Sequence, residues 1–189
     1  MPLDLDRRRM MQLSLLAAVP GLIALGPSEV VAAEQRSDFD FFLGSWKVKH
    51  RRLKKRLANN TEWEEFEGST TCQSILGGIA NLNDSVSHRA GGTYRGMGLR
   101  AFDAKTSTWA DWWLDGGNPT KIDVPGVGRF ADGVGTFLSD DTFEGRPIKV
   151  RGLWSDVTPN SLQWAQAFSP DDGKTWETNW VMRYTRMSK

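Results

Sequence analysis

Beyond Gly44 the sequence divides into short runs of alternating apolar and polar residues, separated by glycine, asparagine, aspartate or proline. Because successive side chains of a strand point to opposite faces, this period of two is typical of β-structure. No long amphipathic helical pattern follows Gly44, which argues against a helical bundle. The expected strands are Ser45–Arg51, Thr61–Glu67, Thr70–Leu76, Ile79–Ser87, Tyr94–Phe102, Thr108–Leu114, Gly128–Ala131, Val134–Ser139, Lys149–Val157, Leu162–Phe168 and Trp176–Arg186.

The order of these segments favours one architecture. About ten antiparallel strands joined in sequence order suit an up-and-down β-barrel, which removes exposed sheet edges by closing on itself. A sandwich of two sheets is the alternative. The Phe-rich segment Asp38–Leu43 predicts a short helical lead-in before the first strand. We therefore expect an all-β barrel domain over residues 34–189, with room inside for side chains and one small ligand.

Residues 1–33 have the features of an export signal peptide. Arg7-Arg8-Arg9 precede an apolar run from Leu13 to Leu25, and Val31-Ala32-Ala33 supplies small residues for cleavage. The apolar run is shorter than the ~20 residues that span a bilayer, so we expect cleavage and no membrane anchor. The arginines followed by Met10-Met11 resemble the twin-arginine type of signal, with an ordinary secretory signal as the alternative. The predicted location is periplasmic or secreted.

Charge and cysteine content restrict the partners and the chemistry. With 24 basic against 23 acidic residues, the net charge of +1 gives no field that favours nucleic acid. The basic run Lys47–Arg56 and the acidic run Glu62–Glu67 are close enough in sequence to pair across a hairpin. Cys72 is the only cysteine, so the chain has no internal disulfide, and we expect Cys72 to be a buried thiol.

The segment Gly44-Ser45-Trp46, after the Phe-rich lead-in, resembles the Gly-x-Trp signature of the calycin superfamily. That superfamily includes lipocalins, fatty-acid-binding proteins and nitrobindin. The resemblance implies that Trp46 closes the floor of a barrel and that a basic residue of the last strand, Arg183 or Arg186, packs over it. A wider set resembles an uncharacterised bacterial lipocalin-like family over residues 38–186: Phe42–Trp46, Thr61–Gly68, Trp112–Asp115, Gly128–Phe130 and Trp176–Trp180.

Haem and metal ions are not expected as cofactors. Nitrobindin-like barrels bind haem through a histidine late in the chain, whereas the two histidines here, His50 and His88, both lie in the first half. Lys47-Val48-Lys49 also replaces the glycines that those proteins carry after Gly-x-Trp. Two histidines among scattered carboxylates show no metal-ligand spacing.

Nine tryptophans supply most of the candidate ligand contacts. They are either ordinary core or the flat walls of a cavity, with polar groups that orient a ligand. Trp112 and Trp113 must point to opposite faces, and the sequence leaves open which one points inward. An inward Asp111 is expected to be a buried acid with a raised pKa. The candidate ligand-binding residues are Trp46, His50, Arg100, Asp111, Trp113, Trp164, Gln166, Asn179 and Trp180.

Three functions agree with these features. The first is an exported soluble barrel that binds a small apolar or planar molecule. The second is an enzyme that uses the same cavity for isomerisation, cyclisation or hydrolysis, with His50, Asp111 or Arg100 in proton transfer or charge stabilisation. The third is a barrel filled by its own side chains that works through its outer surface. The sequence assigns no catalytic residue and leaves a homodimer open.

Overall fold

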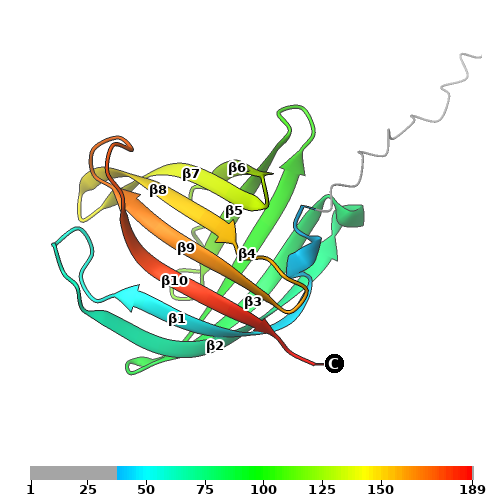
Figure 1. Cartoon of the computed structure of the whole chain (residues 1–189), viewed down its shortest axis with the longest axis horizontal. Helices are drawn as coiled ribbons and strands as arrows, with labels where there is room; N and C mark the ends of the chain where they lie inside the picture. Colours follow the sequence, from blue (N-terminus) through cyan, green and yellow to red (C-terminus); the bar gives the residue numbers. More distant parts are fainter. Residues whose placement is uncertain (1–37, 189) are drawn as a thin grey trace, which may run out of the picture. The chain divides into compact units, whose positions relative to one another are not determined.

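The computed structural model describes residues 38–188, so the expected signal peptide at 1–33 lies outside the described residues. Ten antiparallel strands close into a barrel in which every strand pairs with its sequence neighbours, and β1 pairs with β10 (Figure 1). The predicted all-β up-and-down barrel is therefore confirmed. The elements are η1 Asp40–Phe42, β1 Gly44–Leu53, β2 Trp63–Ile75, η2 Leu76–Gly78, β3 Ala80–Arg89, β4 Gly92–Asp103, β5 Thr108–Asp115, β6 Gly126–Ala131, β7 Val134–Phe143, β8 Arg146–Ser155, β9 Ser161–Ser169 and β10 Glu177–Arg186.

Gly68 does not separate two strands as the sequence predicts. It lies in the middle of β2, paired with Val48 of β1 on one side and Ser87 of β3 on the other. A Cβ atom at Gly68 would lie 2.4 Å from the carbonyl oxygen of Val86 and 3.0 Å from Nε2 of His50. The glycine thus permits a close approach inside the sheet, which a sequence pattern does not distinguish from a turn.

The turn between β7 and β8 is shorter than the sequence predicts, since the expected strands end at Ser139 and resume only at Lys149. Glu144 and Gly145 form it with φ angles of 49° and 77°. Positive φ favours glycine in a two-residue hairpin loop, so β7 continues to Phe143 and β8 already begins at Arg146. The irregular stretch after Asp115 is confirmed, because no named strand lies between β5 and β6.

Aromatic side chains seal one end of the barrel, which we call the floor. The helical lead-in is a single 3-10 turn, and it buries Phe42 together with the preceding Phe39. The ring of Phe39 contacts Trp109 edge-on at 5.0 Å and Phe130 at 4.9 Å between centroids. Trp46 is completely buried, and its indole N–H donates to the carbonyl oxygen of Phe42 over 2.8 Å.

Arg186, rather than Arg183, is the basic residue that packs over Trp46. Its guanidinium carbon lies 4.0 Å from the centre of the indole ring. The same guanidinium donates to the carbonyl oxygens of Leu43 at 2.7 Å and Phe41 at 2.8 Å. Because side chains alternate along β10, Arg183 points to the outer face. The floor expected from the calycin resemblance is therefore present.

The basic and acidic runs pair on the first hairpin as predicted. Lys54 and Glu62 lie 3.2 Å apart, and Arg51 and Glu65 lie 4.0 Å apart, all with largely exposed side chains. Such exposed pairs contribute little to stability, about 0–1 kcal/mol each. Within residues 38–188, no helix is both long and apolar enough to cross a bilayer.

Candidate ligand-binding cavity

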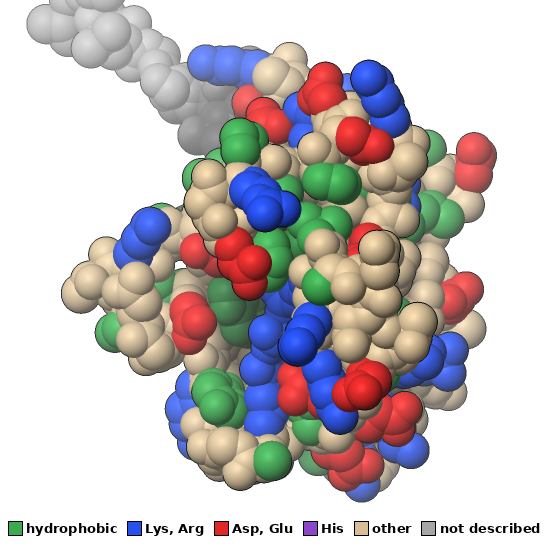
Figure 2. Space-filling model, turned by 90° about the vertical axis from the view of Figure 1, so that its left-hand side faces the viewer, with side chains coloured by type: hydrophobic (Ala, Val, Ile, Leu, Met, Phe, Trp, Pro, Cys, Tyr) green, Lys and Arg blue, Asp and Glu red, His purple; other side chains and the backbone are tan. Residues whose placement is uncertain are grey.

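Above the floor the barrel is hollow. The cavity has a volume of about 620 Å³, within the range typical of small-molecule sites. It is bordered at one end by residues of the β1–β2 and β5–β6 loops, including Arg56, Asp123 and Val124. Figure 2 shows this end of the molecule hollowed, with Lys and Arg side chains along one side of the hollow and apolar side chains inside it. We call this end the mouth.

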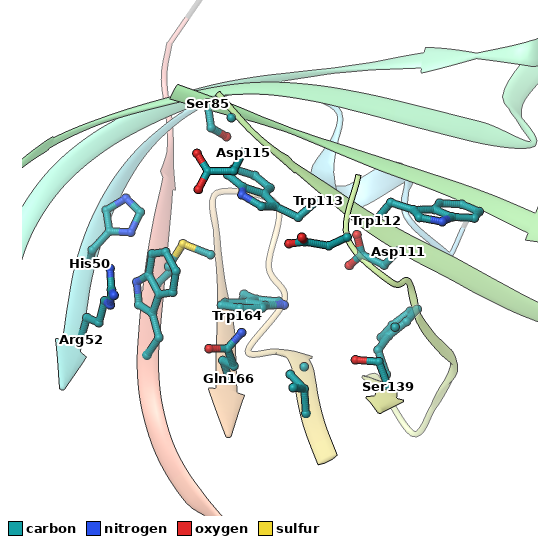
Figure 3. A pocket seen from close by; sticks show the side chains of 18 of the residues that line it. His50, Arg52, Ser85, Asp111, Trp112, Trp113, Asp115, Ser139, Trp164 and Gln166 are labelled. Atoms are coloured by element: carbon teal, nitrogen blue, oxygen red, sulfur yellow. The ribbon is translucent and has the colours of Figure 1, made fainter. Parts of the chain in front are cut away.

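Aromatic side chains form much of the cavity wall. Trp164 and Phe168 of β9 and Trp180 of β10 border the cavity, and the rings of Trp164 and Trp180 meet edge-on with centroids 6.1 Å apart. Strand alternation places Trp164, Gln166 and Phe168 on one face of β9, and all three border the cavity, where Figure 3 shows Trp164 and Gln166 side by side. Deeper in, Phe137 and Trp154 join the wall to the floor cluster.

On β5 the side chains of Trp109, Asp111 and Trp113 point inward, and Asp115 follows them at the mouth. Trp109 is part of the floor, and its indole N–H donates to Asp38 at 3.0 Å. The indole of Trp113 lies over Gly96 of β4, so closely that a Cβ atom there would lie 2.1 Å from the ring. The sequence left open which of the neighbouring tryptophans Trp112 and Trp113 points inward. In the structure it is Trp113, and not Trp112 (Figure 3).

Two of the candidate contacts do not border the cavity. Trp46 lies beneath it in the floor. Asn179 is fully buried at a β-bulge, where the register of β10 shifts between Thr178 and Trp180. Strict alternation along Trp176–Arg186 predicts one common face for Thr178 and Trp180. This is wrong, because the extra residue turns Trp180 inward while Thr178 is exposed.

Arg100 lies at the lower end of the cavity inside a polar network. It is 3% exposed, its Nε donates to Asn81 at 2.6 Å, and a second nitrogen donates to Asn83. Nη1 lies 3.4 Å from a carboxylate oxygen of Asp111. Its guanidinium carbon also lies 5.0 Å from the ring centre of Phe42 in the floor. A buried charge needs such partners, so this network is a structural layer between floor and cavity.

Asp111 points inward, the orientation for which the sequence predicts a raised pKa. Burial raises the pKa of its carboxyl group, and the positive charge of Arg100 opposes that rise. Cys72 lies near the same network: its thiol is 3.5 Å from Oδ1 of Asn81, and burial raises its pKa to about 11. The thiol is therefore protonated at neutral pH, which agrees with the predicted structural role.

His50 borders the cavity from β1 and contacts aromatic rings. It stacks on Phe66 with ring centroids 4.5 Å apart and lies 5.9 Å from Trp180. Burial, and then the positive charge of Arg89, lower its pKa to about 4, so the imidazole is neutral at pH 7. Among the described residues its Nδ1 has no hydrogen-bond partner. That atom is available to a bound molecule.

Three arginines at the mouth, Arg52, Arg56 and Arg89, are not among the contacts that the sequence predicts. The predicted first strand ends at Arg51, but β1 continues to Leu53, and this continuation puts Arg52 on the inner face with His50 (Figure 3). Extending the alternation of Trp46, Val48 and His50 by two residues would have found it. Arg89 precedes two glycines that indicate a loop, yet it pairs with Gly92 as the last residue of β3.

Several polar atoms of the cavity wall lack a partner among residues 38–188. Both hydrogen-bond donors and acceptors are among them, and all belong to side chains that border the cavity. Buried polar atoms in proteins are normally hydrogen-bonded, so atoms without a partner indicate a place for a bound molecule. A ligand or water of suitable polarity can bind them. These atoms are His50 Nδ1, Arg52 Nε, Arg89 Nε, Gln166 Oε1 and Trp180 Nε1.

No family model matches the chain, and no curated protein matches it. Among solved structures, the S-type phycobiliprotein lyase CPES from Guillardia theta is similar, with a TM-score of 0.56 and 13% sequence identity. The similarity covers 80% of this chain and 91% of the lyase chain. The chain has a lipocalin-like barrel fold. At this identity the similarity concerns the fold alone.

The lipocalin-like barrel brings together His50, Arg100, Asp111, Trp113, Trp164, Gln166 and Trp180 around one cavity. Their role as ligand contacts remains a prediction. Within residues 38–188, no group of three His, Cys, Asp or Glu side chains converges as metal ligands do. The arrangement offers flat apolar walls, a few unpartnered polar atoms and a positively charged edge.

Proposed function

We propose that this lipocalin-like barrel binds a small, largely apolar and planar molecule in its central cavity. The observation that carries the proposal is a hollow of about 620 Å³ whose walls include Trp113, Trp164 and Trp180. Indole rings offer large flat surfaces that stack on planar ligands. The floor, closed by Phe39, Phe42 and Trp46, leaves the mouth as the entrance.

Binding is favoured over catalysis by the partners of the candidate acid–base groups. The carboxylate of Asp111 lies beside Arg100, which Asn81 and Asn83 also contact, so this acid is already engaged in a structural network. His50 contacts aromatic rings, and no hydrogen bond joins it to a described carboxylate. A general base needs an orienting partner of that kind in most known sites. The hollow interior likewise argues against the filled-barrel alternative.

The test is native mass spectrometry of the protein purified from its own organism under non-denaturing conditions. A co-purifying molecule that adds a constant mass and is released by organic solvent supports the proposal. A second measurement is quenching of tryptophan fluorescence by a panel of fatty acids, porphyrins, planar aromatics and an open-chain tetrapyrrole. The tetrapyrrole is included because the similar structure is a phycobiliprotein lyase. Absence of both adduct and quenching contradicts the proposal.

A matched pair of tryptophan substitutions assigns the binding to the cavity. Trp113→Ala removes a wall residue whose side chain is 39% exposed, so the fold should tolerate the change. Trp176→Ala removes an indole that does not border the cavity and packs instead beside Arg151. We expect roughly tenfold weaker binding of a planar ligand for the first variant, because stacking of a planar group on an aromatic ring contributes about 1–3 kcal/mol. The second variant should bind normally.

We also propose that the protein acts outside the cytoplasm after loss of residues 1–33. The arginine run Arg7–Arg9, the apolar run Leu13–Leu25 and the small residues Val31–Ala33 support this location. Mass spectrometry of the exported protein should find a new N-terminus near residue 34. Replacing Arg7 and Arg8 by lysine should block export by the twin-arginine route and leave an ordinary secretory signal working.

A further inference from the structure

The mouth of the cavity carries a cluster of three arginines that we call the arginine rim: Arg52 of β1, Arg56 of the β1–β2 loop and Arg89 of β3. We propose that the ligand carries a single anionic group, of the carboxylate type, and that the arginine rim binds it while the apolar body lies among the tryptophans below. This proposal rests on the proposed binding function and specifies its ligand class.

The guanidinium groups of Arg52 and Arg89 lie against the aromatic wall of the cavity. The guanidinium carbon of Arg89 is 4.5 Å from the ring centre of Phe66 and 5.5 Å from that of Trp180. The guanidinium of Arg52 reaches the same Trp180 ring at 5.2 Å. Two charged groups from β1 and β3 thus meet over one indole. Stacking on a ring fixes the plane of a guanidinium and leaves its edge free for an anion.

The rim arginines are poorly neutralised by the protein. Arg52 has one carboxylate within 4.0 Å, that of Glu64, at the limit of an ion pair. Arg89 makes no salt bridge to any described residue. The Nε atoms of both Arg52 and Arg89 are buried without a hydrogen-bond partner in the described part of the chain. Buried donors without acceptors are costly, and a carboxylate supplies the missing acceptors.

Electrostatics support the geometry. Burial, and then the charges of Arg52 and Arg89, lower the pKa of Arg56 to about 10. Burial and Arg89 likewise lower the pKa of Arg52. Three like charges gathered beside a hydrophobic wall repel one another, so a bound anion relieves the repulsion. On an ordinary outer surface, arginine side chains are solvated and lie farther apart, so they do not lower one another's pKa in this way.

The opposite side of the mouth has the opposite charge. Asp115 of β5, Asp123 of the β5–β6 loop and Asp141 of β7 border the cavity there, and Figure 3 shows Asp115 beside Trp113, on another wall than Arg52. Burial, then Asp141 and Asp115, raise the pKa of Asp123. An anion is therefore attracted to one side of the mouth and repelled from the other. This asymmetry favours a ligand with one anionic group and fixes its orientation.

Two fluorescent probes of nearly the same shape test the proposal. 8-Anilinonaphthalene-1-sulfonate carries an anionic group, and N-phenyl-1-naphthylamine is its uncharged counterpart. We expect the anionic probe to bind at least tenfold more tightly than the neutral one, and its affinity to fall with added sodium chloride. Displacement of the neutral probe by dodecanoate and by dodecanol extends the comparison to carboxylates. Dodecanoate should compete at a lower concentration than the alcohol.

Substitutions locate the anion. Arg89→Gln and Arg52→Gln should each weaken the anionic probe about tenfold, which corresponds to about 1.4 kcal/mol, and change the neutral probe less than twofold. Arg89→Lys keeps the positive charge, so this variant should still bind the anionic probe more tightly than the neutral one, by a smaller factor than the wild type. Arg51→Gln is the matched control, since Arg51 is the neighbour of Arg52 on the outer face of the same strand, with an exposed side chain near Glu65. It should leave both affinities unchanged.

The outcomes separate this inference from the proposed function. If the neutral probe binds and the anionic probe shows no preference, the arginine rim does not bind the anion and only this inference fails. It fails in the same way if Arg89→Gln weakens both probes equally. If no member of either pair binds the folded protein, the cavity is not a ligand site and both proposals fail. Thermal unfolding of each variant confirms that it is folded before it is compared.

Discussion

At the scale of single residues, contacts of different kinds hold the floor of the barrel together. Trp46 is fully enclosed and donates one hydrogen bond to Phe42, whereas Arg186 lies at the edge of the floor and donates to three carbonyl oxygens, those of Phe41, Leu43 and Pro159. The indole thus contributes mainly through burial. The guanidinium instead ties the lead-in and the β8–β9 connection to β10.

Replacing Trp46 by alanine removes a fully enclosed tryptophan of the floor. We expect the free energy of unfolding to fall by about 3–5 kcal/mol, the usual cost of truncating a buried aromatic. Urea denaturation followed by circular dichroism measures it. Trp46→Phe, which keeps much of the volume, should lose less. A loss under about 1 kcal/mol for the alanine variant would place this side chain outside the core.

Arg186→Ala removes both the cation–π contact and the hydrogen bonds to the lead-in. We expect a loss of about 2–3 kcal/mol in the free energy of unfolding, since hydrogen bonds from charged groups contribute roughly 1.5–3 kcal/mol and are not additive. Arg183→Ala is the control, because Arg183 lies three residues earlier on the outer face. Chemical denaturation of both variants gives the comparison. Equal losses would show that the position over Trp46 carries no special stability.

His50 predicts a dependence of stability on pH. Its pKa is about 4 in the folded protein and 6.5 in the unfolded chain, so the unfolded chain binds the proton more readily. The contribution of the neutral imidazole is complete above pH 6.5 and is lost as the pH falls from 6.5 to 4. The loss reaches about 3 kcal/mol at most. The difference in stability between the wild type and His50→Gln, measured from pH 7 to 4, isolates this contribution, with exposed His88→Gln as control.

At the scale of elements, close contacts between neighbouring strands depend on particular glycines. In β2, Gly68 is flanked by β1 and β3, and any side chain there meets the backbone of Val86. The bulge in β10 is a second irregularity within the sheet. It inserts the extra residue Asn179 and thereby turns Trp180 toward the cavity. Both features direct side chains inward or permit packing in ways that simple alternation does not predict.

Gly68→Ala should destabilise the barrel by about 1–3 kcal/mol, because the added Cβ would lie 2.4 Å from a backbone oxygen that cannot move freely. Gly126→Ala is the comparison, since its nearest neighbour is Cβ of Phe137 at 3.3 Å and a small shift relieves it. Denaturant midpoints of the two variants measure the difference. If Gly68→Ala is the milder change, the sheet is less tightly paired at that point than the structure indicates.

At the scale of the whole molecule, closure of the sheet creates an interior whose two ends differ. One end is filled by rings of the lead-in and the first strand, and the other is lined by charged groups from several loops. A ligand that binds only the closed barrel stabilises all ten strands together, because each strand pairs with two neighbours. Ligand binding should therefore raise the midpoint of a single cooperative transition.

A free concentration of N-phenyl-1-naphthylamine about 100 times its dissociation constant should stabilise the folded protein by about 2.7 kcal/mol. For a domain of this size that corresponds to a rise of roughly 5–10 °C in Tm. Differential scanning calorimetry measures the shift, and the cavity variant Trp113→Ala should show a smaller one at the same probe concentration. A shift that does not grow with probe concentration would argue against binding to the native state.

The sequence by itself determined the class of fold and most of the inward-facing residues. Alternation placed Trp46, Val48 and His50 on one face, and Gly44-Ser45-Trp46 indicated a closed floor. It assigned Gly68 to a turn and Arg89 to a loop, because glycine within a strand and arginine at a strand end carry no distinctive local signal. A period of two depends only on the chain's own geometry, so it can be recognised from the sequence.

Only the tertiary structure decided which residues share the cavity. The arginine rim joins side chains from β1, β3 and a loop, and their proximity follows from the register of paired strands. The bulge at Asn179 depends on the partner strand β9, which the local sequence of β10 does not describe. Register and bulges are set by hydrogen bonds between distant segments, and for that reason the chemistry of the mouth became evident only once the barrel was closed.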